Sequence, residues 1–164
     1  MINYMKSIIR ILIVLMLTLS FQPFANAQSI NGFRIGNEYT YSQFVSSFGI
    51  PESYCPYGNG DEKSESYYYD GLYLETQHGG VLYCFSIKSS NYVTLTENIP
   101  GGVRCGDQFS KVQPLAAHIK IFETENADND YITTYHVWFG CDDNSYNITV
   151  KNGIITGICY IMLD

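Results

Sequence analysis

A thirteen-residue segment occurs twice in this chain, 70 positions apart. Residues 31–43 read NGFRIGNEYTYSQ, and residues 101–113 read GGVRCGDQFSKVQ without a gap. Two glycines, an arginine and a glutamine are identical, and most other positions are chemically similar. Because chance rarely gives such agreement, we expect two related units, repeat one over about 31–96 and repeat two over about 101–164.

Each copy of the segment predicts a helix. Thr40 and Ser110 can each accept a backbone N–H as the residue that caps a helix N-terminus. In repeat one the apolar residues of 41–48 follow helical spacing, and Gly49 is a typical end. In repeat two the apolar residues of 112–119 have the same spacing, so we expect a second helix there.

Strand-like runs follow the first predicted helix. Residues 67–76 and 81–87 are rich in tyrosine and branched residues, and they flank Gly79-Gly80, which predicts a hairpin. We expect further strands over residues 92–96 and 131–139.

The last part of the chain contains a stronger hairpin signal. Asn152-Gly153 separates two strand-like runs, residues 145–151 and 154–162. A two-residue turn at these positions pairs Lys151 with Ile154 and Val150 with Ile155. The pairing continues outward in the same way, so the numbers of each pair sum to 305. This register places Cys159 on the same face of the sheet as Val150.

The order helix, strands, helix, strands predicts an α+β fold. We expect two tandem helix-plus-antiparallel-strand repeats that form one sheet, with helices on one face and the other face open.

Three motifs resemble a known family. They are the opening R-[IC]-G-x-x-[YF]-[ST], the helix end at residues 48–51, and Y-x-Y-D-G-L-x-L at residues 67–74. Together they resemble the tandem repeats of beta-lactamase-inhibitor-protein-like (BLIP-like) exported proteins, over nearly all of residues 28–164. The resemblance implies protein binding through an open, often aromatic sheet face, and it carries no active site. Repeat two departs from the pattern at residues 118–120.

The first 27 residues have the layout of a secretory signal peptide. A basic start, an apolar run over about residues 11–21 and the sequence Ala25-Asn26-Ala27 follow one another. The run is shorter than the roughly 20 residues that cross a bilayer, so we expect cleavage after Ala27 and no membrane span afterwards. An uncleaved anchor is the alternative. Residues 28–164 would then form a single mature domain, secreted or periplasmic.

Charge restricts the partners of such a domain. Lys6 and Arg10 leave with the signal peptide, which changes the formal net charge from −7 to −9. An acidic chain repels phosphate backbones and attracts basic proteins, so we expect no nucleic acid partner. The alternative is that the charge only keeps the protein in solution.

The reactive side chains do not form a known catalytic or metal-binding motif. The five cysteines lie outside any C-x-x-C motif, and the three histidines lack the i, i+4 spacing of a zinc helix. Their odd number leaves at least one cysteine unpaired, and the sequence does not select a disulfide pairing. We expect no metal, no cofactor and no enzymatic activity. The cysteines are Cys55, Cys84, Cys105, Cys141 and Cys159.

These features predict an exported protein-binding module, either an inhibitor of an exported enzyme or an immunity protein that neutralises a toxin. Tyrosines on the open sheet face would supply apolar contact, and acidic loops would steer a basic partner. An envelope-assembly or structural component is one alternative, and a small hydrolase with a histidine beside a cysteine, a serine or a carboxylate is another. The candidate partner-binding residues are Tyr67, Tyr69, Tyr73, Tyr135 and Trp138.

Overall fold

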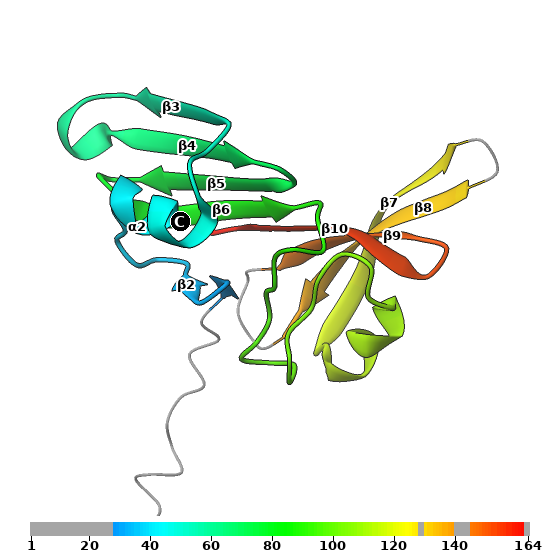
Figure 1. The fold of residues 1–164 in the computed structure, drawn as a ribbon. Coiled ribbons are helices and arrows are strands. Elements are labelled where there is room, and N and C mark those ends of the chain that lie inside the picture. Colours follow the sequence, from blue (N-terminus) through cyan, green and yellow to red (C-terminus); the bar gives the residue numbers. More distant parts are fainter. Residues whose placement is uncertain (1–27, 128–129, 140–144, 163–164) are drawn as a thin grey trace, which may run out of the picture.

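One antiparallel sheet of eight strands dominates the computed structural model, which describes residues 28–127, 130–139 and 145–162 (Figure 1). Its strands are β3 (Ser53–Tyr57), β4 (Ser64–Tyr69), β5 (Leu72–Gln77), β6 (Val81–Ile87), β7 (His118–Ala127), β8 (Asp130–Trp138), β9 (Tyr146–Lys151) and β10 (Ile154–Ile161). Two short strands, β1 (Ser29–Ile30) and β2 (Phe33–Arg34), pair separately. The helical elements are α2 (Tyr41–Phe48) and the 3-10 turns η1 (Gly60–Glu62), η2 (Phe109–Lys111) and η3 (Gln113–Leu115).

The sheet consists of two four-stranded meanders that meet at one junction. Its strand order is β3-β4-β5-β6-β10-β9-β8-β7, so β6 of the first meander pairs with β10 of the second. Four residue pairs form this junction, from Ile87↔Ile158 to Cys84↔Ile161. The sheet twists strongly there, and the strands of the second meander run at a steep angle to those of the first (Figure 1).

The hydrophobic core lies against one face of the sheet. A row of side chains from seven strands points to this covered face, and α2 and η2 pack on it. Phe44 of α2 is fully buried, with its ring centroid 4.8 Å from that of Tyr67. The row is Tyr67, Leu74, Phe85, Tyr160, Tyr146, Val137 and Ile119.

Helix α2 begins and ends as its sequence predicts. Thr40 and Gln43 form a capping box, in which each side chain bonds the other residue's backbone N–H. Gly49 follows the last helical residue with φ +86°, a conformation that favours glycine. The predicted helix over residues 41–48 is therefore confirmed.

The two copies of the repeated segment dock on equivalent hairpins. Gly36 N–H donates to Leu82 O at 2.8 Å, and Gly106 N–H donates to Ile155 O at the same distance. Three residues further along each copy, Tyr39 N–H bonds Gly80 O and Phe109 N–H bonds Gly153 O, both at 2.8 Å. Each copy thus lies against the turn end of the last hairpin in its own meander.

The predicted fold class, two helix-plus-strand repeats in an α+β domain, is wrong. The described residues contain one α-helix of eight residues, and their regular structure is otherwise mainly strand. In repeat two the expected helix over 112–119 is replaced by η3 and the start of β7, and η2 lies just before them. Pro114 lies in η3 without an N–H to donate, and neither 3-10 turn has a side-chain cap. From His118 onward the chain pairs with β8 instead.

A bulge also corrects the predicted register of the last hairpin. Lys151↔Ile154 and Val150↔Ile155 sum to 305 as expected, but the register then shifts at Thr156, and Thr149 pairs with Gly157. The shift turns Ile158 and Tyr160 toward the covered face, where both are buried. Cys159 consequently points to the opposite face from Val150.

The other strand predictions are partly right. Residues 81–87 form β6 as expected, and β8 lies within one residue of the predicted 131–139. Residues 67–76 span two strands, β4 and β5, because the chain turns at Gly71 with φ +72°. Residues 92–96 contribute only isolated bridges at Thr94.

Candidate binding groove

A continuous row of side chains crosses all eight strands on the face opposite the core, which we call the open face. Its members come from directly paired positions, so each lies next to the following one across the sheet. These side chains are mostly polar or amphipathic, whereas the row from Tyr67 to Ile119 on the covered face is mostly apolar. The row is Ser53, Tyr68, Tyr73, Ser86, Cys159, Asn147, His136 and Lys120.

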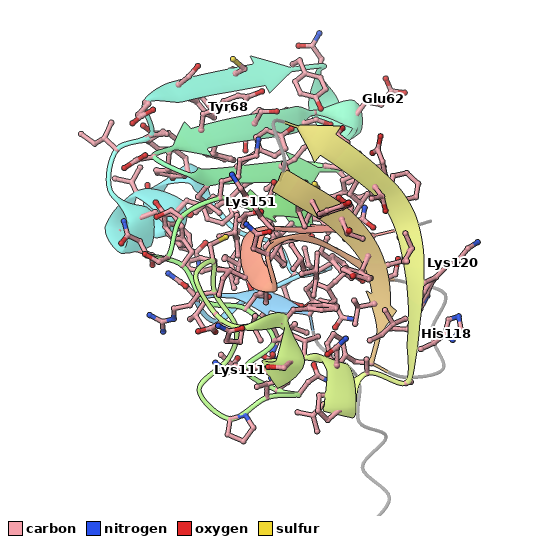
Figure 2. All side chains as sticks on the ribbon, turned by 90° about the vertical axis from the view of Figure 1, so that its right-hand side faces the viewer. Glu62, Tyr68, Lys111, His118, Lys120 and Lys151 are labelled. Carbon is pink, nitrogen blue, oxygen red and sulfur yellow. The ribbon has the colours of Figure 1, made fainter. Side chains whose placement is uncertain are left out.

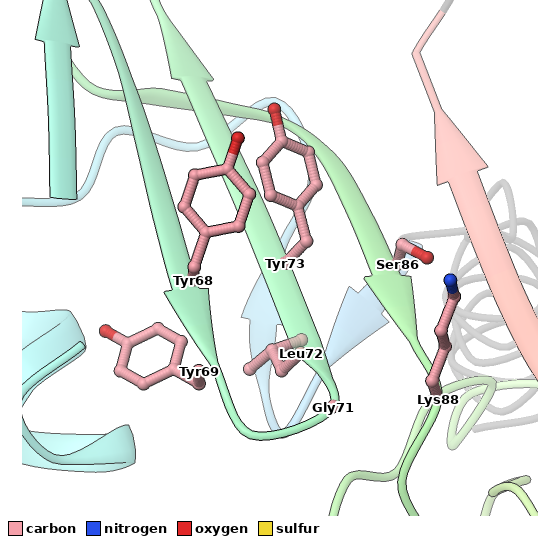
Figure 3. A pocket seen from close by; sticks show the side chains of 7 residues that line it. All are labelled: Tyr68, Tyr69, Gly71, Leu72, Tyr73, Ser86 and Lys88. Carbon is pink, nitrogen blue, oxygen red and sulfur yellow. The ribbon is translucent and has the colours of Figure 1, made fainter. Parts of the chain in front are cut away.

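Two tyrosines of this row form an exposed aromatic pair. Tyr68 and Tyr73 stand side by side on β4 and β5, with ring centroids 5.0 Å apart (Figure 3). Tyr68 is 43% exposed, whereas Tyr73 is half-buried beside it. The two rings line a shallow hollow of about 510 Å³, the tyrosine hollow, together with Tyr69, Gly71, Leu72, Ser86 and Lys88.

A carboxylate holds the tyrosine hydroxyls in place. Tyr73 OH donates to Glu75 Oε2 at 2.6 Å, and Tyr57 OH donates to Glu75 Oε1 at 2.5 Å. Burial and the hydrogen bond to Glu75 raise the pKa of Tyr73, and the bond to Glu75 raises the pKa of Tyr57. Both phenols therefore keep their protons, and the negative charge in this part of the open face is that of Glu75.

A second hollow lies on the open face of the other meander. Its volume is about 340 Å³, and Lys88 lines both hollows, so the two meet at this residue. Thr134 and Thr149 lie within hydrogen-bond distance of each other, with their hydroxyl oxygens 3.2 Å apart. This threonine hollow is lined by Lys88, Glu123, Glu125, Ile132, Thr134, Thr149, Thr156 and Gly157.

The two hollows together form what we call the open-face groove. One end presents aromatic rings, and the other presents hydroxyl groups and two carboxylates beside Lys88. Such a groove offers apolar contact next to negative charge. It suits a partner segment that carries a basic side chain close to an apolar one.

Histidine and tryptophan gather further along the open face, near the outer edge of the second meander. The ring of His136 lies 5.7 Å from that of Trp138 and 4.6 Å from that of Phe122. His118 and Lys120 project outward from β7 (Figure 2). Within the described residues, no three His, Cys, Asp or Glu side chains come together in a way that could hold a metal ion.

Ser145 lies beside a histidine, an arrangement in which a serine can act as a nucleophile. Its Oγ lies 3.3 Å from His136 Nδ1, which is long for an activated serine. The His136 imidazole contacts the rings of Phe122 and Trp138, which cannot orient it as a carboxylate would.

The five candidate residues from the sequence divide between the two faces. Tyr67 is fully buried in the core, Tyr69 is 7% exposed, and Tyr135 stacks on Phe109 with centroids 4.5 Å apart. Only Tyr73 and Trp138 belong to the open face, and both are half-buried.

Sequence reasoning missed the two most exposed tyrosines of the open face, Tyr68 and Tyr57. In the run of tyrosines at 67–69, strand alternation requires the middle ring to point away from its neighbours. The burial of Tyr67 and Tyr69 under α2 therefore forces Tyr68 to the other face. That alternation was the signal for Tyr68.

No protein-family model, curated protein or solved structure matches this chain. The fold and the groove define an all-antiparallel chain with a covered face and an open, grooved face. Among the helices of residues 28–127, 130–139 and 145–162, none has both the length and the apolar character that a membrane crossing needs. The expected signal peptide, residues 1–27, and Cys141 lie outside the described residues.

Proposed function

We propose that this chain is an exported protein-binding module that captures a basic partner protein in the open-face groove. The observation that carries the proposal is the pairing of an exposed aromatic ring, Tyr68, with the acidic groups that line the same face. The resemblance to BLIP-like repeats supports a binding role of this kind. An inhibitor of an exported enzyme, or an immunity protein against a toxin, is the form that we favour.

The chemistry of the groove specifies what the partner presents. A lysine or arginine over the ring of Tyr68 would gain a cation–π contact, which is worth about 0.5–1 kcal/mol at an exposed site. The same cation would lie near carboxylates, since Glu75 accepts the Tyr73 hydroxyl beside Tyr68 and Glu123 and Glu125 line the threonine hollow. A partner whose binding loop combines a basic and an aromatic residue would fit both ends.

The groove residues are held in place before a partner arrives. Both oxygens of Glu75 are occupied by tyrosine hydroxyls, which restrains the rings of Tyr57 and Tyr73. Rigid aromatic anchors lose little conformational entropy on binding, and central tyrosines are typical of binding hot spots.

A matched pair of tyrosine substitutions tests the proposal. Tagged full-length chain is expressed in its own host, crosslinked to bound protein and recovered, and the captured protein is identified and then titrated with purified variants. Tyr68→Ala should weaken its dissociation constant by about tenfold or more, the usual size of a hot-spot loss. Tyr131→Ala is the control, because Tyr131 is 67% exposed but lies on the covered side of β8.

The salt dependence provides a second measurement. Capture by acidic groups predicts that affinity falls as ionic strength rises, mainly through slower association. Equal affinity of the wild type and Tyr68→Ala for the partner would exclude the groove as the binding surface. An envelope defect on deletion of the gene, with no dependence on a target enzyme or toxin, would favour the envelope-assembly alternative.

A further inference from the structure

Two cysteines meet where the two meanders join. Cys84 lies on β6 and Cys159 on β10, and both point to the open face. Cys159 pairs with Ser86, and Cys84 pairs with Ile161, so the two cysteines are diagonal neighbours across the junction. The bulge at Thr156 creates this arrangement, because without it Cys159 would point to the covered face.

The two thiols share one face of the sheet at diagonal positions of the junction. They affect each other's ionisation, which favours the protonated form of Cys84 and the thiolate of Cys159. Both cysteines are reduced in the structure, and Cys84 is buried while Cys159 is half-buried. Cys105, the next cysteine after Cys84 in the sequence, is buried on the core side, where its thiol donates to Ile87 O at 3.6 Å.

We propose that Cys84 and Cys159 form a disulfide that covalently links the two meanders when the protein meets an oxidising compartment. Diagonal neighbours on antiparallel strands have Cα atoms roughly 7–8 Å apart. A disulfide needs about 4.4–6.8 Å, so closure draws β6 and β10 slightly together. Both side chains lie on the same face of the sheet, so neither has to cross the sheet for the bond to form.

The local charges assign a role to each sulfur. The interaction with Cys159, burial and the nearby carboxylate of Glu75 raise the pKa of Cys84. The interaction with Cys84 lowers the pKa of Cys159. Cys159 is also the more exposed of the two, so it ionises first and is the sulfur that an external oxidant reaches.

The oxidant is a disulfide, either oxidised glutathione or the active-site disulfide of an oxidoreductase. The Cys159 thiolate attacks one of its sulfurs, forms a mixed disulfide and releases the other as a thiolate, which takes the proton of Cys84. The Cys84 thiolate then attacks the Cys159 sulfur and releases the second sulfur as a thiolate, which takes up the proton that Cys159 lost on ionising. Two protein thiols are oxidised to one disulfide, and the external disulfide is reduced to two thiols.

The disulfide would strengthen the junction between β6 and β10, which is the short connection between the two meanders. The junction between β6 and β10 has four residue pairs, whereas β7 and β8 pair over nine. A crosslink there closes the loop from Cys84 to Cys159, which stabilises the folded state by restricting the unfolded one. Because Ser86 lines the tyrosine hollow and is paired with Cys159, the bond would also fix the angle between the two ends of the groove.

A redox titration of the purified full chain tests the proposal. The protein is equilibrated with mixtures of oxidised and reduced glutathione, the remaining thiols are alkylated, and the peptides are mapped without reduction. We expect one crosslinked pair of peptides containing Cys84 and Cys159. We also expect that adding dithiothreitol lowers the midpoint of thermal unfolding by roughly 5–15 °C.

Three variants complete the experiment. Cys84→Ser and Cys159→Ser should each remove the crosslink and make the unfolding midpoint insensitive to dithiothreitol. Cys55→Ser, at an exposed position on β3, should keep both the crosslink and the sensitivity. If either serine variant fails to fold, the reduced and oxidised wild type supply the same comparison. Alkylation of both thiols under oxidising conditions, or pairing of either one with a different cysteine, would overturn the proposal.

Discussion

The Tyr73 hydroxyl donates a hydrogen bond of 2.6 Å to Glu75, two residues further along β5 on the open face. The neighbouring strand β4 repeats this relationship on the covered face, where Tyr67 OH donates to Glu65 Oε2 at 2.9 Å. Tyr54 also donates to Glu65, and Lys63 lies 2.7 Å from its Oε1. Each face of the first meander thus has a carboxylate held by two tyrosines, one facing the groove and one in the core.

The covered carboxylate predicts an acid-sensitive stability. Burial alone would raise the pKa of Glu65, but hydrogen bonds from Lys63, Tyr54 and Tyr67 outweigh it and hold the pKa below the ordinary 4.5. A lowered folded-state pKa stabilises the protein above the unfolded value, and this contribution is lost as pH falls below about 4.5 through the folded pKa.

Glu65→Gln tests this contribution. The variant should have a lower free energy of unfolding at pH 7, by about 1–3 kcal/mol for a charged hydrogen-bond acceptor. The difference from wild type should shrink as pH falls from 5 to 3 in urea titrations. Glu62→Gln, at an exposed position in η1, is the control and should follow the wild-type pH curve. A constant difference between wild type and Glu65→Gln across this range would contradict the assignment.

The contact between α2 and the sheet predicts a large loss on truncation. Phe44 is fully buried and touches the rings of Phe33, Tyr39, Phe48 and Tyr67. Phe44→Ala should therefore lower the free energy of unfolding by about 3–5 kcal/mol. Val45 is only half-buried on the same helix, so Val45→Ala should cost clearly less. Equal losses in urea denaturation would show that Phe44 is not a core contact.

The two repeat copies differ at their capping positions, which gives a matched experiment. Thr40 accepts the Gln43 N–H and Gln43 Oε1 accepts the Thr40 N–H at 2.8 Å, whereas the turns around Ser110 lack any side-chain cap. Thr40→Ala should lower the free energy of unfolding by about 1 kcal/mol. Ser110→Ala should leave it within roughly 0.5 kcal/mol, the usual range for a surface change. A loss of 1 kcal/mol at Ser110 would indicate a cap there after all.

Local signals in the sequence located elements that depend on neighbouring residues alone. Asn152-Gly153 forms the turn between β9 and β10, with φ values of +52° and +79° that these two residues tolerate. Thr40 caps α2 and Gly49 ends it. Each of these outcomes follows from a few backbone hydrogen bonds within one short stretch of chain.

Features that depend on contacts between distant parts of the sequence could not be predicted in the same way. The bulge at Thr156 lets Ile158 and Tyr160 join the core, a gain that depends on β6 lying beside β10. The segment from His118 forms β7 because β8 offers it a partner, although its apolar spacing also suits a helix. The face of Tyr67 and Tyr69 depends on α2 packing over them, so two of the five candidate contact residues proved to be core for this reason.

The repeat-related glycines provide the last prediction, because they occupy unlike surroundings. Gly32 has φ +88° with open space where a Cβ would be, so Gly32→Ala should cost only the strain of a left-handed backbone, about 1–2 kcal/mol.

Gly102 has φ +65°, and a Cβ there would meet Val93 Cγ2 and lie 2.7 Å from Thr94 O. The backbone of Thr94 is fixed by two hydrogen bonds with Val103 at 3.0 and 2.8 Å, so it cannot move aside cheaply. Gly102→Ala should therefore lower the free energy of unfolding by about 3 kcal/mol or more. Urea denaturation of both variants measures the difference, and equal losses at the two glycines would mean that the packing around Gly102 is looser than its contacts indicate.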